Sequence, residues 1–245
     1  MLLRRMIDHV RKQEWTAVIL DFMIVVTGIL IAFQITNWSE TRADRRDEKR
    51  YLAELAVNLE ADRMQARNGQ EASLQRLAAA EAILARAAPD YDRPPFFVQI
   101  NRDLPTPGAF ADYPYAYLAS YSFMVSAENT FDELIQTGNI GVLSNRALVT
   151  ELTRYYDRMD RQRGDDVLIL SQAEGMLDWV RENGLGMADR AGLEETVALA
   201  QADDTFLGFV KMASFLAYWQ YNSFASIEND ADALLAAVEA EMETR

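Results

Sequence analysis

The pattern of hydrophobic and polar positions sets the start of the chain apart from the rest. The residues between Trp15 and Trp38 are almost all apolar, and Asp21 is the only ionisable side chain over positions 16–36. Twenty-one helical residues rise about 31 Å, which matches the hydrocarbon thickness of a bilayer. Tryptophan is typical of membrane interfaces, because its ring lies in lipid while its N–H meets water. The pattern predicts one transmembrane helix over residues 15–38.

Polar helix-forming residues follow without a proline as far as Ala88, and their leucines recur at spacings of three, four and seven. This periodicity predicts a stalk helix over residues 39–88, with Gly69 as its weak point and a partly solvated middle over residues 61–70. Residues 89–112 hold five of the six prolines and predict a loop, in which the run 96–100 forms extended backbone packed on helices.

The remaining residues, 113–245, show helical periodicity and no proline- or glycine-bounded alternation typical of strands. We expect a helix over residues 127–136 that stops at Gly138, since glycine favours the left-handed conformation at a helix end. A longer helix is expected to start at an Asn145 cap and run to Gly184, with Gly164 as a candidate break.

Two further helices are expected near the C-terminus. Asp203 or Asp204 can cap the first of them, which carries a wide apolar face that extends to Trp219. Apolar residues from Ile227 to Met242 mark the second. The predicted fold class is therefore all-α. One N-terminal transmembrane helix continues into the stalk, and a helical bundle packs with that stalk.

Charge bears on both location and partners. The formal net charge is −14, and residues 39–245 hold 20 basic and 35 acidic residues, a net charge of −15. Such an acidic domain disfavours nucleic-acid binding and adsorption to anionic lipid. Residues 1–14 form a short basic tail, and no small-residue cleavage site follows the apolar stretch, which indicates an uncleaved signal anchor. We expect a bacterial inner-membrane protein with a cytoplasmic N-terminus and a periplasmic bundle, although the basic residues on the two sides of the span nearly balance.

One face of the predicted span carries the candidate docking residues, which are Asp21, Val25, Gly28, Ala32 and Ile35. Gly28 and Ala32 form a small-xxx-small pair that lets another helix approach closely, and an acid within lipid usually faces protein. The alternative is that Asp21 bends toward water at the cytoplasmic interface and that Gly28 is incidental. The first interpretation predicts a lipid-embedded helix that docks on other transmembrane helices.

Aromatic residues gather just after the loop. Four tyrosines lie close together in sequence beside Phe110 and Phe123: Tyr113, Tyr115, Tyr117 and Tyr121. They could form a surface for a sugar or peptide partner, since their hydroxyls give polar tips to apolar rings. The alternative is that they form a seam of the core.

Patterns typical of catalysis or metal binding are scarce. The chain has no cysteine, and its single histidine, His9, lies before the span. Glu128, Asp132 and Glu133 therefore lack the Glu-x-x-His partners of a di-iron site. Residues 228–232 lack the glycine and glutamate of a calcium loop, and we expect them to form a helix N-terminus or a solvated face. We predict no enzyme activity and no cofactor, with a carboxylate-based hydrolase as the remote alternative.

The segment Gly28-Ile-Leu-Ile-Ala32-Phe-Gln-Ile-Thr-Asn37-Trp38 follows an acid seven residues before its glycine. It resembles an uncharacterised bacterial family of single-span membrane proteins whose anchor is G-x-L-I-A-x-Q-x-x-N-W, often with Glu at the position of Asp21. A second, looser similarity covers Phe131-x-x-Leu-x-x-Thr-Gly-x-Ile140, then Leu143, Leu148 and Tyr155-Tyr156. The resemblance implies architecture and location and transfers no catalytic residues.

These observations favour a membrane-anchored interaction or scaffold protein, either an accessory subunit of a membrane assembly or a homo-oligomer. A periplasmic ligand-sensing module is the alternative. Against it, only about fourteen residues precede Trp15, too few for a cytoplasmic output domain.

Overall fold

The computed structural model describes residues 15–92, 114–186 and 191–244, and over these ranges it contains helices, turns and irregular segments without a strand. The protein is all-α, as the hydrophobic pattern predicts. The predicted basic tail and most of the predicted loop, including its extended run, lie outside the described residues.

The chain divides into two compact units, Met1–Arg50 and Tyr51–Arg245, and helix α2 (Trp15–Ala87) supplies residues to both. In the first unit, large apolar side chains of α2 are exposed, among them Phe22 at 66%, Ile29 at 64% and Phe33 at 66%. The most apolar 18-residue window has a mean hydropathy of 1.6 and none of it is buried. By length and composition, this helix is able to cross a membrane.

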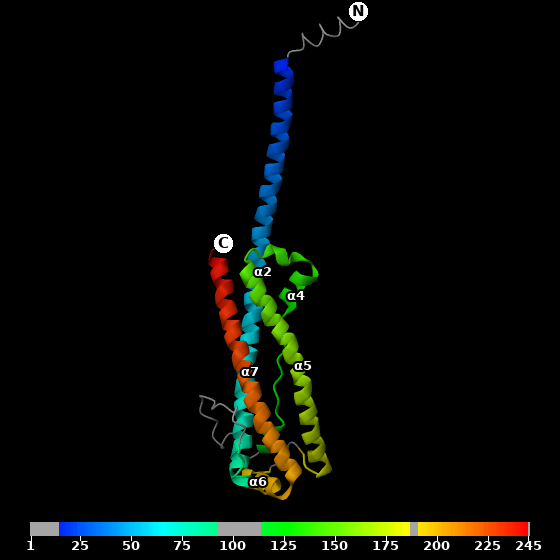
Figure 1. Ribbon diagram of the computed structural model, residues 1–245, viewed down its shortest axis with the longest axis vertical. Helices are drawn as coiled ribbons and strands as arrows, with labels where there is room; N and C mark the ends of the chain where they lie inside the picture. The colour runs from blue at the N-terminus through cyan, green and yellow to red at the C-terminus, as the bar shows by residue number, and fades with distance from the viewer. Residues whose placement is uncertain (1–14, 93–113, 187–190, 245) are drawn as a thin grey trace, which may run out of the picture. The chain divides into compact units, whose positions relative to one another are not determined.

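The second unit is a bundle of three long helices, which are α2 from Tyr51 onward, α5 and α7 (Figure 1). Shorter helices lie at its two ends, with α6 at one end and α4 at the other. The elements after α2 are α3 (Pro114–Leu118), α4 (Asn129–Gln136), the 3-10 helix η2 (Asn139–Val142), α5 (Arg146–Glu182), α6 (Leu193–Ala202) and α7 (Asp204–Glu243).

The bundle has two hydrophobic cores. The first lies toward α4 and the C-terminal end of α7, and the leucines of the predicted stalk stripe, such as Leu52 and Leu59, are fully buried in it. The second lies toward α6, where Trp179 stacks on Phe206 with ring centroids 4.7 Å apart. The stretch 61–70 is partly solvated, as predicted: Asp62, Ala66 and Gln70 are each less than 5% exposed on its buried face, whereas Met64 on the opposite face is 56% exposed.

Buried polar side chains separate these two cores. They come from all three long helices and comprise Gln70, Ser73, Arg76, Gln162, Asp166, Ser214 and Gln220. Ser223 donates a hydrogen bond to Gln162 at 2.6 Å, and Ser214 donates one to Glu81 at 2.8 Å. Such bonds are required because a buried polar group without a partner costs free energy.

The predicted helix ends are mostly confirmed. Asn145 Oδ1 accepts from the backbone N–H groups of Ala147 and Leu148 at 3.1 Å, and Asp203 Oδ1 accepts from that of Phe206 at 2.7 Å. Gly138 and Gly184 adopt φ values of 73° and 69°, the left-handed conformation that glycine tolerates best.

Other predictions of helix boundaries are wrong. Gly164 does not break α5, and α7 is one continuous helix where two were expected. Residues 228–232 consequently lie in the middle of α7 and are not a helix N-terminus. Their exposed positions Asn229 and Asp232 fit the alternative of a solvated face, on which the acids form ion pairs. Gly69 is no weak point either, because α2 passes through it and the ring of Phe224 packs where a Cβ would stand, 2.6 Å away.

Candidate functional site

Residues 120–128, here called the crossing segment, link α3 to α4 without regular secondary structure. The segment is mostly half-buried, and side chains of α2 and α7 bond several of its backbone groups, which therefore keep hydrogen-bond partners where water is excluded. Arg76 donates to the carbonyl of Ser120 at 2.8 Å, and Gln220 donates to that of Ser122 at 2.9 Å. The guanidinium of Arg76 also bonds Gln220 and lies 4.2 Å from the centre of the Tyr121 ring. Burial lowers the pKa of Arg76 to about 10, so it stays cationic at neutral pH.

Asp62 holds the far end of the crossing segment. Its carboxylate accepts from the backbone N–H of Ala127 at 2.7 Å and from the hydroxyls of Ser126 and Tyr155 at 3.0 and 3.1 Å. Desolvation raises the pKa of Asp62 despite these three donors, and the charge of Glu128 raises it further. This buried acid and the buried Arg76 therefore serve a structural purpose, which is to fix the crossing segment against α2.

A groove lies between α5 and α7 on the surface of the bundle, here called the α5–α7 groove. It consists of two adjoining hollows of about 600 and 690 Å³ that share Arg158 and Arg161. Both volumes lie in the range typical of binding sites. The first, the apolar hollow, has a floor formed by the side chains Ala147, Leu148, Ala233, Leu234 and Ala237. The second, the polar hollow, is lined by Arg158, Arg161, Gln162, Trp219, Asn222 and Ser223.

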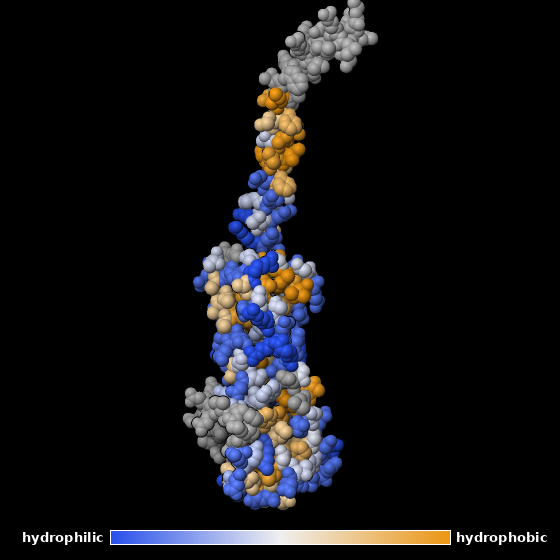
Figure 2. Space-filling model, viewed as in Figure 1, coloured by the Kyte–Doolittle hydropathy of each residue, from blue (hydrophilic) through white to orange (hydrophobic). Residues whose placement is uncertain are grey.

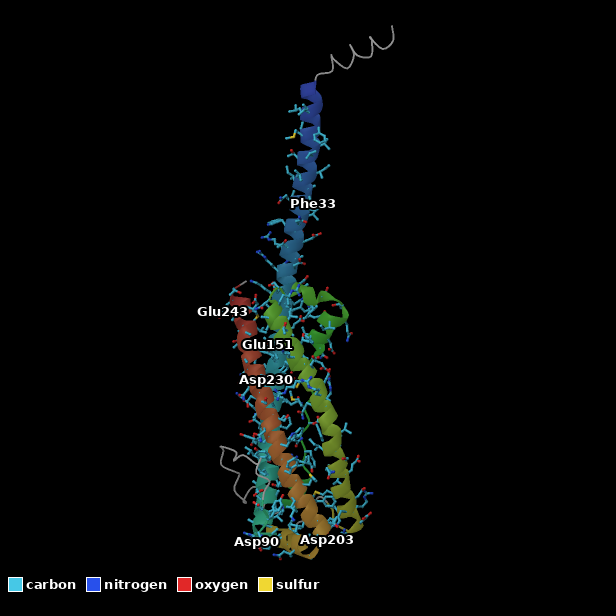
Figure 3. The ribbon with its side chains drawn as sticks, viewed as in Figure 1. Phe33, Asp90, Glu151, Asp203, Asp230 and Glu243 are labelled. Atoms are coloured by element: carbon cyan, nitrogen blue, oxygen red, sulfur yellow. The ribbon has the colours of Figure 1, made fainter. Side chains whose placement is uncertain are left out.

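The charges along this groove are unusual for so acidic a chain. Arg154 pairs with Glu151 and Arg158 pairs with Asp230, whereas exposed Arg161 has no ion pair among the residues the structure describes. None of the described side chains that line the polar hollow is a carboxylate. Figure 3 labels Glu151 on α5 and Asp230 on α7, and Figure 2 shows a strongly hydrophilic band across the middle of this face of the bundle. Among the side chains that the structure describes, the groove thus offers a cation without an ion pair, Arg161, beside an apolar floor.

The predicted docking face of the apolar helix lies in the first unit. Val25 and Ile35 are 59% and 61% exposed, and no atom lies within 4 Å of a Cβ built on Gly28. Ala32 is exposed as well. Asp21 and Trp15 belong to α2, but their side chains lie outside the described part of the chain. Docking at this face stays a prediction.

Trp38, predicted at the membrane interface, is 62% exposed, and the guanidinium of Arg42 lies 4.5 Å from the centre of its ring. In this cation–π contact, the guanidinium of Arg42 lies over a ring that is one turn earlier on the same helix.

The four tyrosines predicted as a partner surface have different environments. Tyr113 lies outside the described residues, as does the side chain of Tyr115. Tyr117 is partly buried and packs against the second core, and Tyr121 lies under Arg76, where burial raises its pKa. The contact of Tyr117 with the second core corresponds to the core interpretation at that position, and a partner surface formed by this cluster stays a prediction.

Acidic residues do not gather into a metal-binding group within the described ranges. The acids that the sequence offered as metal candidates have other contacts. Glu128 accepts two hydrogen bonds from Arg163, at 2.8 and 3.1 Å, and Glu133 accepts one from the hydroxyl of Tyr51 at 3.0 Å.

Sequence reasoning missed both the crossing-segment contacts and the groove. A signal existed for Asp62, because it lies three residues after Leu59 and so falls in phase with the leucine stripe of its helix, where a polar residue must be buried and bonded. Arg76 lies between Leu74 and Leu77, out of phase with that stripe, and gave no such signal. Arg154, Arg158 and Arg161 share one helical face at spacings of four and seven. No local pattern indicates that α7 lies beside them.

The fold and its surface features define a helical-bundle protein with one apolar N-terminal helix of membrane-spanning length. No protein-family model, curated protein or solved structure matches the chain.

Proposed function

We propose that this protein is a non-enzymatic interaction protein anchored in a bacterial inner membrane by the apolar part of α2. Its N-terminus lies in the cytoplasm and its bundle in the periplasm, where it acts as an accessory subunit of a membrane assembly or as a homo-oligomer. The observation that supports this proposal best is the run of exposed apolar side chains from Phe22 to Ile35. Contiguous exposure of this extent is unfavourable in water and favourable in lipid.

The face through Asp21, Gly28 and Ala32 supports docking on other transmembrane helices. Two small residues four positions apart let helix backbones approach, and a carboxyl group in lipid gains from a partner that satisfies it. Copies of this chain and the helices of other membrane proteins are the two kinds of partner this face accepts.

Fractionation of cells that express the full chain tests the anchor. We expect the protein to remain in the membrane pellet after washing with alkaline carbonate and to dissolve only in detergent. Recovery of a soluble chain that is trimmed after Trp38 would contradict the proposal.

Crosslinking in native membranes tests the docking face. Gly28→Leu is expected to remove crosslinked species, because its side chain blocks close approach of a second helix. Thr27→Leu adds similar bulk one position outside this face and is the matched control. Equal crosslinking in both variants would remove the docking face from the proposal while leaving the anchor intact.

A further inference from the structure

The α5–α7 groove has the length of a helix rather than of a small molecule. Its lining residues on α5 run from Asn145 to Gln162, a rise of about 26 Å, and those on α7 run from Trp219 to Ala237, about 27 Å. Two hollows placed end to end along a pair of helices therefore match a partner segment of about seventeen helical residues.

The floor of the apolar hollow suits the backbone of such a segment. Leu148 and Leu234 are 4% and 6% exposed and form its base, while Ala147, Ala233 and Ala237 are exposed and small. Ala233 and Ala237 are four residues apart and lie on one face of α7. Small residues in this arrangement leave room for a third helix at the usual separation of about 8–10 Å.

The charges specify the chemistry of that segment. Arg161 has no ion-pair partner among the described residues, and the described side chains that line the polar hollow include no carboxylate. The domain as a whole is strongly acidic, so an acidic partner is repelled over most of its surface. Complementary charge at Arg161 would then fix where and in which register the partner binds, because Arg158 is already paired with Asp230.

We infer that the α5–α7 groove docks an amphipathic helix of a partner protein, with apolar residues on the alanine and leucine floor and an acidic residue facing Arg161. Helix-in-groove recognition of this kind is a recurring mode of peptide binding. The inference rests on the proposed interaction function and names the partner chemistry of the bundle.

The test uses the full chain in lipid nanodiscs and two fluorescein-labelled synthetic helices of eighteen residues. One peptide carries a leucine stripe flanked by glutamates, and the other has lysine at every glutamate position. Fluorescence anisotropy is expected to show binding of the glutamate peptide only. Arg161→Glu should weaken that binding by about tenfold or more, whereas Arg181→Glu, the same charge change outside the groove, should leave it within about twofold.

A second pair of variants tests the floor. Ala237→Trp fills the apolar hollow and is expected to abolish binding, while Ala236→Trp lies beside it, outside the groove lining, and should bind like the parent chain. Both positions are exposed, so neither change disturbs the core. Agreement of circular dichroism spectra among the four variants confirms that the fold is retained.

Equal binding of the two peptides, or equal behaviour within either pair of variants, would overturn the inference. Full displacement of the glutamate peptide by millimolar inorganic phosphate would also overturn it, because that result would indicate a site for small anions. A chain that dimerises in native mass spectrometry, and loses the dimer only in Ala237→Trp, would instead identify a second copy as the occupant. Carbonate fractionation of the same variants separates these outcomes from failure of the membrane anchor.

Discussion

Single residues in this bundle are constrained by contacts that their chemistry alone does not reveal. Gly69 and Gly164 both lie inside long helices, where glycine is intrinsically unfavourable. Gly69 faces the buried ring of Phe224, whereas nothing lies within 4 Å of a Cβ built at Gly164. The two glycines are therefore expected to respond in opposite ways to the same substitution.

Gly69→Ala is expected to lower the free energy of unfolding by about 1–3 kcal/mol, because its methyl group overpacks against Phe224. Gly164→Ala is the matched control and should raise that free energy by about 0.5–1 kcal/mol through helix propensity. Urea denaturation of the full chain in detergent, followed by tryptophan fluorescence, measures both. A gain in stability for both variants would show that Phe224 moves aside at little cost.

The pH dependence of stability isolates Asp62. Because burial raises its pKa in the folded state, Asp62 favours folding below its unfolded pKa, and this contribution is lost as the pH rises through the folded pKa. Asp62→Asn keeps an acceptor for the N–H of Ala127 and cannot ionise. The free energy of unfolding of the parent chain, relative to that of Asp62→Asn, should therefore fall as the pH rises from the unfolded pKa of Asp62 through its folded pKa.

The same denaturation experiment, repeated over a pH series, measures this difference. A difference that stays constant across the acidic range would contradict a raised pKa for Asp62. Asp62→Ala is expected to be less stable than Asp62→Asn at every pH, by about 1–3 kcal/mol, because it leaves the N–H of Ala127 and the hydroxyl of Tyr155 without an acceptor.

At the scale of elements, the connection from the crossing segment to α5 depends on how α4 ends. The backbone N–H of Gly138 bonds the carbonyl of Ile135 at 3.1 Å, and η2 follows directly after it. The left-handed φ of 73° at Gly138 reverses the chain so that Leu143 and Leu148 enter the first core. A residue with a Cβ resists this conformation.

Gly138→Ala is expected to destabilise the protein by about 1–2 kcal/mol, the cost of forcing alanine into the left-handed region. Gly141 lies three residues later without a positive φ, and a Cβ at this position would have no atom within 4 Å. Gly141→Ala should therefore change stability little or raise it slightly. Thermal unfolding monitored by circular dichroism compares the two, and equal losses would argue against a special role for Gly138.

The whole molecule is expected to place its bundle on the periplasmic side. Because the chain has no cysteine, a single introduced thiol reports its own location. Ala236→Cys, on an exposed position of α7, should react with a membrane-impermeant maleimide in intact spheroplasts. Lys12→Cys, in the basic tail, should react only after the membrane is permeabilised, and the opposite labelling pattern would reverse the proposed orientation.

The sequence by itself determined the helical class, the apolar segment and most helix ends. These features follow from local information: the 3.6-residue period of the leucines, the side-chain oxygens of Asn145 and Asp203, and the left-handed glycines at positions 138 and 184. Each acts within a few residues of its own position, so no tertiary contact is needed to recognise it.

Only the tertiary structure decided which polar residues are buried and what they bind. Arg76 meets the crossing segment 44 residues away in sequence, and Arg158 meets Asp230 72 residues away. The α5–α7 groove and the packing of Phe224 on Gly69 likewise arise between helices distant in sequence. Helical periodicity specifies which face of a helix is apolar, but it does not specify which helix covers that face, because many pairings bury similar apolar area.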